Sequence, residues 1–402
     1  MYPKPELNTK TIYSYLHNGH MMWDQSWFNE IKRCDPSSLY IYEASTKRLC
    51  SKMYWGWDQV PPKRIASRKA MEEYAHLFVQ STIDLELADM SSIGIGLSGG
   101  LDSRWIAQIL SKEKACTAHC FSFDHNWELS LSRRVASELH IPHTFHELSA
   151  SNWLENRLES LWHSDACLHL GHLHEGNLHR DLLQHSDVFY HGFYGGGIYA
   201  GMNELNKRID RETAARYFKV EHGKFKLDDP FFNAKTIDPY IVHHRMRYQA
   251  AYSIFLLSSY TKIAIPFYDL DWIMFNYSID DKDQAYGRFY LNVLNRELSN
   301  DLLNIPWQRT GLHPKFIGAN CLFQKFKLNS AFEKIYNLMG KSRHVINYSI
   351  FDEQIEFWLK EFASDIKNLD QNFNLKKREH KLRMLSLVVW NRMLQKDSPH
   401  VL

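Results

Sequence analysis

The strongest constraint on this chain is an alternation of apolar strands with amphipathic helices in its first half. Stretches typical of buried strands cover residues 93–97, 117–123, 144–148 and 187–191. Apolar residues at helical spacing lie between them, over residues 102–112, 128–139, 151–162 and 166–184. Strands that alternate with helices pair in parallel, and the helices then cover the faces of the sheet. The pattern predicts an α/β fold with a parallel, doubly wound sheet.

The flanking regions add weaker signals. A helix is predicted over residues 66–86, strands over 39–42 and 53–55, and a mostly helical region from residue 239 onward. The formal net charge of +2 argues against a nucleic-acid binder that works by bulk charge. No apolar run fits a signal peptide or a membrane span, and the six cysteines form no disulfide framework. These features predict a cytoplasmic protein with reduced cysteines, no nucleic-acid partner and no membrane.

One segment between a strand and a helix carries the chemistry. It reads Ser98-Gly99-Gly100-Leu101-Asp102-Ser103. Backbone amides at a helix start attract anions, and glycines let a phosphate group approach that backbone closely. Asp102 would repel phosphate unless a cation such as Mg²⁺ lies between them. A valine at position 99 is expected to abolish nucleotide binding, because its side chain would occupy the phosphate path.

Three alternatives compete with this interpretation of the loop. Gly94, Gly96 and Gly99 formally match the dinucleotide-binding fingerprint, with Asp124 as the acid for the ribose. That fingerprint needs a strand before its first glycine, whereas the first two glycines lie inside the strand. A Walker loop at residues 340–342 lacks its first glycine. A glycine turn without a ligand is the third alternative, and the six-residue string is more specific than such a turn.

The loop resembles the pyrophosphate-binding loop of the asparagine synthetases and their relatives, which include β-lactam synthetase and lasso-peptide cyclases. Further segments resemble the family or its divergent members: Met53-Tyr54-Trp55, residues 265–269, residues 305–311 and residues 385–390. The resemblance implies a sheet of the adenine-nucleotide alpha-hydrolase (PP-loop) type, followed by a largely helical C-terminal region. It also implies two parts. Residues 1–60 would be the remnant of a glutaminase-like domain, and residues 61–402 the ATP-pyrophosphatase domain, with its nucleotide core at about 90–205 and its helical part at about 239–402.

In this family a substrate carboxylate attacks the α-phosphate of ATP, pyrophosphate leaves, and ammonia or an amine displaces AMP. The resemblance therefore implies an ATP-dependent carbon–nitrogen ligase with ATP and Mg²⁺ as cofactors. Asp102 would act in catalysis and bind Mg²⁺, with Asp165 as a second metal ligand. The residues implied to bind the nucleotide are Leu97, Ser98, Gly99, Gly100, Leu101, Asp102, Ser103, Phe121, Ser122, Phe123 and Gly192.

The chain departs from the family at its acids. Gly196 and Gly197 stand where the family usually has carboxylates after the fourth strand. A second carboxylate beside Asp102 would then come from Asp165, Asp269 or Glu204. Helix capping is the structural alternative for Asp165, and a hydrogen bond within a turn is the alternative for Asp269.

Two further departures concern the catalytic cation and the nitrogen donor. Tyr290 stands where the family's catalytic lysine falls, and Lys282 and Arg288 are the candidate substitutes. The chain begins Met1-Tyr2 rather than with the nucleophilic cysteine of a glutaminase domain, so a separate donor would supply ammonia or an amine. The substrate would be a small-molecule or peptide carboxylate. The alternatives are a catalytically degenerate nucleotide-binding or partner protein of the same fold, and a dinucleotide-dependent enzyme.

Overall fold

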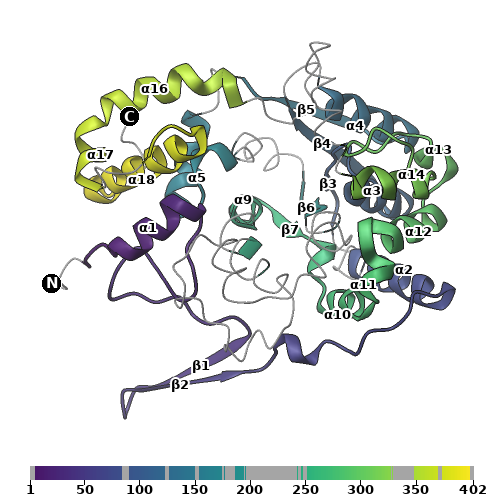
Figure 1. The fold of residues 1–402 in the computed structure, drawn as a ribbon, viewed down its shortest axis with the longest axis horizontal. Coiled ribbons are helices and arrows are strands. Elements are labelled where there is room, and N and C mark those ends of the chain that lie inside the picture. The colour runs from purple at the N-terminus through teal and green to yellow at the C-terminus, as the bar shows by residue number, and fades with distance from the viewer. Residues whose placement is uncertain are drawn as a thin grey trace.

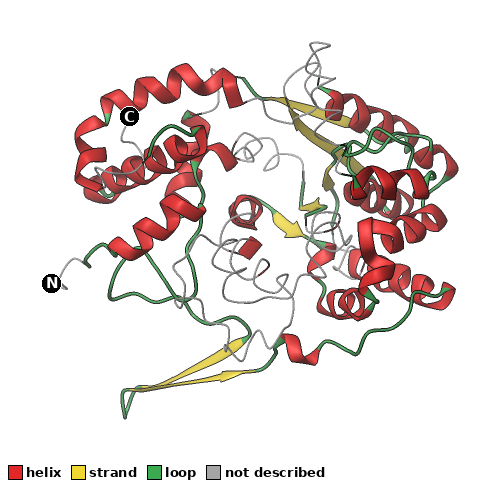
Figure 2. Ribbon diagram, in the orientation of Figure 1, coloured by secondary structure: helices red, strands yellow, loops and turns green. Residues whose placement is uncertain are grey.

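A five-stranded parallel sheet lies at the centre of the structure, which is a computed structural model (Figures 1 and 2). The structure describes residues 5–83, 90–122, 126–149, 154–173, 186–193, 251–326, 348–369 and 374–398, with the single residues 176, 195, 242, 246, 247 and 328. The strands stand in the order β5-β4-β3-β6-β7. Every neighbouring pair in this sheet is parallel, which confirms the predicted fold class.

The four strands predicted from the sequence are all present. The five observed strands are β3 Ile93–Gly96, β4 Cys116–Ser122, β5 His143–Glu147, β6 Val188–His191 and β7 Lys262–Ala264. The helices that connect the first of them are α3 Leu101–Glu113, α4 Trp127–Glu138 and α5 Glu155–His163. The bounds of α3 and α4 lie within one residue of the prediction, because their apolar faces give a clear helical period.

The order of the strands determines where a ligand site is expected. From β3 the chain continues to β4 and β5 on one side of the sheet, and later to β6 and β7 on the other. In open α/β sheets, ligands bind at the carboxyl ends of the strands where the strand order reverses. The residue after β3, Leu97, still donates its N–H to the carbonyl of His119 at 2.8 Å. The loop of residues 98–103 therefore leaves the sheet at this point of reversal.

The first hydrophobic core surrounds the sheet. Its further helices are α2 Arg68–Ile83, α10 Leu270–Ser278, α12 Arg288–Glu297, α13 Asn300–Leu303 and α14 Ile317–Lys325. Phe78 of α2 stacks on Trp105 of α3 with 4.2 Å between ring centroids. Tyr74 of the same helix packs edge-on against Phe289 of α12 at 5.2 Å. Helix α2, predicted over residues 66–86, thus joins the loop-bearing helix to the C-terminal helices.

A second hydrophobic core combines both ends of the chain. Its helices are α1 Thr9–Asn18, α5, α16 Asp352–Glu361, α17 Ala363–Leu369 and α18 Arg378–Lys396. Trp27 packs against Trp390 with ring centroids 5.2 Å apart. The buried guanidinium of Arg383 donates to the carbonyl oxygens of Leu16 and His17, each at 2.9 Å. Helices α1 and α18 consequently lie side by side in Figure 1.

An antiparallel hairpin lies apart from both cores. Its strands are β1 Ser38–Glu43 and β2 Arg48–Met53, and nearly all of their residues are exposed. The strand predicted over residues 39–42 is confirmed, whereas the one predicted over 53–55 ends at Met53 instead of beginning there. The division of the chain at residue 60 stays a prediction.

Two sequence expectations differ from the described parts of the chain. The helix predicted over residues 166–184 does not start at residue 166, because Asp165 and Ala166 have φ angles of 47° and 49°. A 3-10 turn follows at Leu170–His172, and residues 174–175 and 177–184 of this prediction lie outside the described residues. Strand β7 was missed inside a region predicted to be helical, since three residues give no readable period. All six cysteines are free thiols, and none of the described helices combines the length and apolar character that a membrane span requires.

Candidate nucleotide-binding site

The loop at the end of β3 holds itself together through two serines. The hydroxyls of Ser98 and Ser103 lie 3.1 Å apart, and the backbone N–H of Ser98 donates to the Ser103 hydroxyl at 3.2 Å. Gly100, the N-cap of α3, donates its N–H to the Ser98 hydroxyl at 3.1 Å. The serine hydroxyl oxygens thus accept hydrogen bonds from backbone amides next to the start of α3. A helix start is a position that favours anions.

Gly192 brings the end of β6 against this loop. A Cβ atom at Gly192 would lie 2.8 Å from the backbone nitrogen of Ser103 and 3.3 Å from the carbonyl carbon of Asp102. No side chain fits between two backbones at that spacing, so glycine is required here. The structure therefore places Gly192 beside the first turn of α3, and its approach to a nucleotide stays a prediction.

Asp102 accepts a short hydrogen bond from Tyr290, the position at which the resemblance in the sequence placed a lysine. The hydroxyl of Tyr290 donates to Oδ1 of Asp102 at 2.6 Å. Burial raises the pKa of Tyr290 well above its ordinary value, and the negative charge of Asp102 adds to this effect. Tyr290 is therefore a neutral donor at physiological pH. Gly195 packs directly against the Asp102 carboxylate, because a Cβ atom at Gly195 would lie 2.5 Å from Oδ1 of Asp102.

Glu128 is a site residue that the sequence interpretation missed. Its carboxylate is buried in the first turn of α4 and accepts the backbone N–H of Gly99. Nε2 of Gln308 donates to its Oε2 at 3.2 Å. Burial raises the pKa of Glu128 to about 7, and the Gly99 hydrogen bond acts in the opposite direction. A signal was present, because Glu128 shares a helix face with the buried Leu131 and Val135, an unusual place for a carboxylate.

Gly99 faces the protein rather than an open phosphate path. A Cβ atom at this position would lie 2.9 Å from Cδ1 of Leu131 and 2.9 Å from Cβ of Gln308. The backbone N–H of Gln308 also donates to the carbonyl oxygen of Gly99 at 3.1 Å. The expected reason for a glycine at position 99, an open path for phosphate, is therefore corrected. Glycine is needed there because the backbone packs closely against α4 and residues 305–311.

Arg104 fixes residues 302–306 behind the loop. Its guanidinium is fully buried and donates to the carbonyl oxygens of Leu302 at 3.0 Å, Ile305 at 2.8 Å and Pro306 at 2.9 Å. Burial lowers its pKa to about 9, so the group keeps its charge at neutral pH. The segment that resembles divergent family members is thereby attached to the loop-bearing helix.

Arg309 is a cation in the described part of the chain whose charge is attracted by Asp102. It follows Gln308 directly, is half-buried, and has no hydrogen bond or ion pair among the described residues. Burial lowers the pKa of its guanidinium, and attraction to Asp102 acts in the opposite direction. The guanidinium therefore keeps donors available next to the loop.

The two cations predicted from the sequence lie elsewhere. Lys282 is exposed on α11 Asp281–Gln284, and Arg288 is exposed at the start of α12, where it contacts the thiol of Cys321. Neither has a contact with Asp102 in the described part of the structure. The sequence pointed to them because the family pattern was counted from Gly287, and it gave no means of seeing that a distant turn delivers Arg309.

The predicted acids do not gather at Asp102 in the described residues. Asp165 lies at the second core, where its carbonyl oxygen accepts the indole N–H of Trp27 and burial raises the pKa of its carboxyl. Asp269 caps α10 by accepting the N–H of Trp272 at 2.7 Å, which confirms its hydrogen-bonding alternative. Over the ranges that the structure describes, no group of three or more His, Cys, Asp or Glu side chains suits a metal ion. Gly196, Gly197, Glu204, Phe123 and Asp124 lie outside the described residues.

The remaining nucleotide residues predicted from the sequence border the loop through the sheet. Leu97 and Leu101 are buried at either end of the glycine pair. Phe121 and Ser122 end β4, the strand next to β3, and the Ser122 side chain is fully buried. Their side chains therefore support the edge of the sheet, and contact with an adenine through their backbone stays a prediction.

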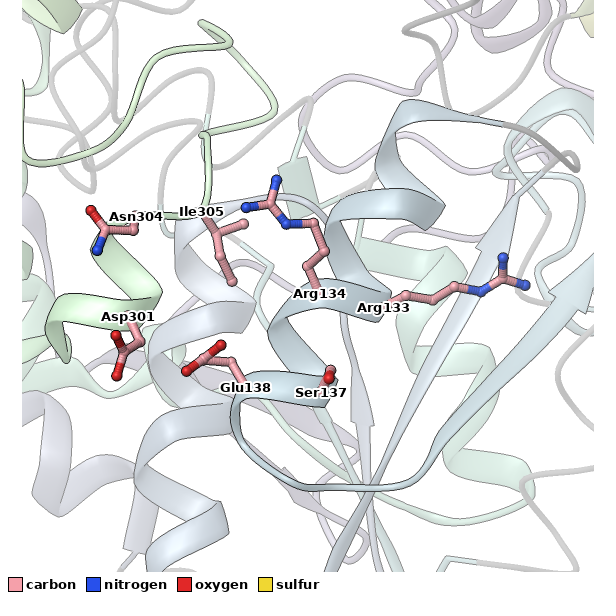
Figure 3. A pocket seen from close by; sticks show the side chains of 7 residues that line it. All are labelled: Arg133, Arg134, Ser137, Glu138, Asp301, Asn304 and Ile305. Atoms are coloured by element: carbon pink, nitrogen blue, oxygen red, sulfur yellow. The ribbon is translucent and has the colours of Figure 1, made fainter.

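A separate pocket lies between α4 and α13 (Figure 3). Its lining residues are Arg133, Arg134, Ser137, Glu138, Asp301, Asn304 and Ile305. The Arg134 side chain extends toward Ile305, whereas the Arg133 side chain extends away from the other lining residues. Two acids and two arginines share this surface, so it offers no clear preference for an anion.

A comparison with known protein families supports the interpretation of the loop at residues 98–103. Residues 74–173 match the family described as asparagine synthase. This stretch includes α2 from Tyr74 onward, the loop and strands β3 to β5. The resemblance stated from the sequence is therefore confirmed over this part of the chain, which is asparagine synthetase-like, and an ATP-using activity is supported. No match to the chain was found among the curated proteins.

Two solved structures have a distant likeness to the chain. The U34-tRNA thiolase NcsA from Methanococcus maripaludis, solved with its 4Fe-4S cluster, is 12% identical, covers 77% of this chain and 84% of its own, and has a TM-score of 0.29. The NMN synthetase from Francisella tularensis is 15% identical, covers 54% of this chain and 95% of its own, and has a TM-score of 0.25. At scores this low, the evidence for the fold is the sheet itself.

Proposed function

We propose that this protein is an ATP-dependent, AMP-forming ligase that activates a carboxylate and joins it to ammonia or an amine. One arrangement carries the proposal: the amides and hydroxyls of residues 98–103 lie at the carboxyl end of β3, with Asp102 and Arg309 beside them. The asparagine synthase match over residues 74–173 supports it. A small-molecule or peptide carboxylate as substrate, a separate nitrogen donor and a cytoplasmic location belong to the same proposal.

The proposed reaction has two steps. A carboxylate oxygen of the substrate bonds to the α-phosphorus of ATP, and the bond from that phosphorus to the oxygen bridging the β-phosphorus breaks. Pyrophosphate leaves with the electron pair of that bond, and an acyl-adenylate remains. The nitrogen of ammonia or an amine then bonds to the acyl carbon, AMP leaves with the electron pair of the broken carbon–oxygen bond, and the nitrogen loses a proton. Backbone amides and hydroxyls of the loop stabilise charge that develops on the pyrophosphate.

Mg²⁺ fits this site through one protein carboxylate. Asp102 would hold it together with phosphate oxygens, an arrangement that this ion accepts because it keeps water molecules as its other ligands. The bound ion would neutralise part of the charge on the departing pyrophosphate. Tyr290 fixes one oxygen of Asp102 through its 2.6 Å hydrogen bond. Among the described residues, a phenol thus contributes to the orientation of this carboxylate.

The test is a product analysis with a panel of carboxylates. The protein is incubated with ATP, Mg²⁺, each carboxylate, and ammonium or a primary amine. We expect AMP and pyrophosphate in equal amounts, and only when an accepted carboxylate is present. Asp102→Asn is expected to abolish both products. Asp271→Asn, an exposed acid in the first turn of α10, is expected to leave both unchanged.

One observation favours the catalytically degenerate alternative. A neutral tyrosine stands in the place of the family's lysine and contacts the loop aspartate directly. If ATP raises the melting temperature but no carboxylate yields AMP, the nucleotide-binding alternative replaces the ligase proposal. Release of ADP and orthophosphate would contradict both.

A further inference from the structure

Arg309 stands on a turn that is closed on itself. The N–H of Gly311 donates to the carbonyl oxygen of Trp307 at 2.7 Å, and the N–H of Trp307 donates to the carbonyl oxygen of Leu312 at 2.8 Å. Gly311 has a φ of 74°, which is the left-handed region that favours glycine. The hydroxyl of Thr310 donates to Oδ1 of Asn320 at 2.5 Å. The position of Thr310, the residue after Arg309, is consequently fixed.

The same turn is attached to the loop at two points. Gln308 donates its backbone N–H to the carbonyl oxygen of Gly99 and its side chain to Glu128. Arg104 donates to the two carbonyls at the start of the turn, those of Ile305 and Pro306. The backbone under Arg309 thus moves with the loop, so the position of its side chain relative to residues 98–103 is set by the fold.

The charge of Arg309 lacks a close partner in the described structure. Attraction to Asp102 is present, but no carboxylate or carbonyl oxygen within hydrogen-bonding distance is described for this guanidinium. The donors of a half-buried guanidinium remain open to solvent, and a ligand can take the place of that water. A phosphate ligand would satisfy them, because the planar guanidinium matches two phosphate oxygens at once.

We propose that Arg309 binds the β- and γ-phosphate groups of the nucleotide and retains the pyrophosphate after it leaves. The inference rests on the proposed function for the identity of the ligand. Lys282 and Arg288, which the sequence offered as substitutes for a catalytic lysine, take no part in this proposed anion site. In this proposal the negative charge of Asp102 attracts the Arg309 guanidinium toward the loop. The phosphate oxygens of the ligand then accept the hydrogen bonds of that guanidinium.

The experiment measures binding of inorganic pyrophosphate by calorimetry at one fixed, saturating concentration of Mg²⁺, so that the repulsion from Asp102 is screened equally in every variant. Arg309→Ala is expected to weaken binding roughly 10- to 100-fold, as for the loss of hydrogen bonds to a charged group. Arg309→Lys is expected to lose less, because it keeps the charge but not the fork. Arg68→Ala is the matched control, since that arginine is 81% exposed and pairs only within α2.

Chemical protection gives a second measurement that needs no variant. Phenylglyoxal modifies accessible arginines, and mass spectrometry locates the modified residues. Saturating pyrophosphate is expected to protect Arg309 but neither Arg68 nor Arg288. Unchanged pyrophosphate affinity in a folded Arg309→Ala, or modification of Arg309 that pyrophosphate does not slow, would overturn the proposal. Loss of affinity in Arg288→Ala alone would do the same.

These outcomes separate the two proposals. Pyrophosphate binding that depends on Arg309, without AMP formation from any carboxylate, would remove the ligase and leave the anion site. AMP formation with pyrophosphate affinity independent of Arg309 would remove the anion site and leave the ligase.

Discussion

The two sides of the loop at residues 98–103 are held by different kinds of contact. On the side of α4, Gly99 is packed so closely against Leu131 and Gln308 that no Cβ atom fits. On the side of α12, Asp102 is held by a hydrogen bond from Tyr290 and lies near a guanidinium. The first side determines the shape of the loop, and the second determines its charge. Variants on the two sides are therefore expected to fail in different ways.

The largest effect is expected from the buried carboxylate on the packed side. The pKa of Glu128 rises from 4.5 to about 7 on folding. Between these values the folded protein binds a proton that the unfolded chain has lost, so the free energy of unfolding falls as pH rises through this window. Glu128→Gln is expected to remove this contribution of roughly 3 kcal/mol, whereas the opposite contribution of the buried His191, whose pKa burial lowers to about 4, remains in both proteins. Denaturant unfolding at a series of pH values measures it.

Two groups make that measurement specific. The neighbouring thiol of Cys120 has a pKa of about 12 and does not titrate in the window. Glu138→Gln, an exposed acid on the same helix, is expected to keep the wild-type slope. Equal slopes in the wild type and in Glu128→Gln would mean that Glu128 is charged in the folded state throughout.

Gly99→Ala comes next and tests the packing. Its Cβ atom has no room, and overfilling a packed site costs about 2 kcal/mol. The free energy of unfolding, measured by urea denaturation, is expected to fall by that amount. Gly318→Ala is the control, because nothing lies within 4 Å of a Cβ atom there and the residue is exposed in α14. A stable Gly99→Ala that loses pyrophosphate binding would show that position 99 faces the ligand after all.

Tyr290→Phe tests the charged side. It removes one hydroxyl that donates to a carboxylate, and we expect a loss of about 1.5 kcal/mol in the free energy of unfolding. Tyr190→Phe is the matched variant, since its hydroxyl donates at 2.9 Å to the neutral carbonyl of Thr82 and should cost less. Only Tyr290→Phe is expected to change pyrophosphate affinity. If the free energy of unfolding falls more in Tyr190→Phe than in Tyr290→Phe, the hydrogen bond from Tyr290 is not made to a charged Asp102 carboxylate.

The smallest effect on stability is expected from Gly100→Ala. Its φ of −75° suits any residue, and a Cβ atom would touch only the Ser98 hydroxyl, at 3.0 Å. The free energy of unfolding should change by no more than about 0.5 kcal/mol. Pyrophosphate affinity, measured by calorimetry, should nevertheless fall, because the methyl group displaces the hydroxyl that shapes the anion site. Unchanged affinity would place the ligand away from this glycine.

The sequence predicted those parts of the fold that depend on neighbours along the chain. Buried strands and amphipathic helices between residues 93 and 147 have periods that can be read locally, and the loop is a specific string. Arg309 meets the loop only through packing between distant segments, for which a single sequence has no local signal. Glu128 did have a local signal, its place on the buried face of α4. Family numbering was misleading for Lys282 and Arg288, because a pattern fixes a position along the chain but not the direction of a side chain.

The contact between α1 and α18 has a consequence for how the chain folds as it is made. Arg383 bonds to carbonyl oxygens 367 and 366 residues earlier, whereas the five-stranded sheet needs only the stretch from β3 to β7. During synthesis the sheet can therefore assemble while α1 still lacks its contact with α18. Because domains fold from the N-terminal end at the pace of translation, α1 waits for this contact until nearly all of the described chain has been made. We expect nascent chains to need protection at α1 until α18 emerges.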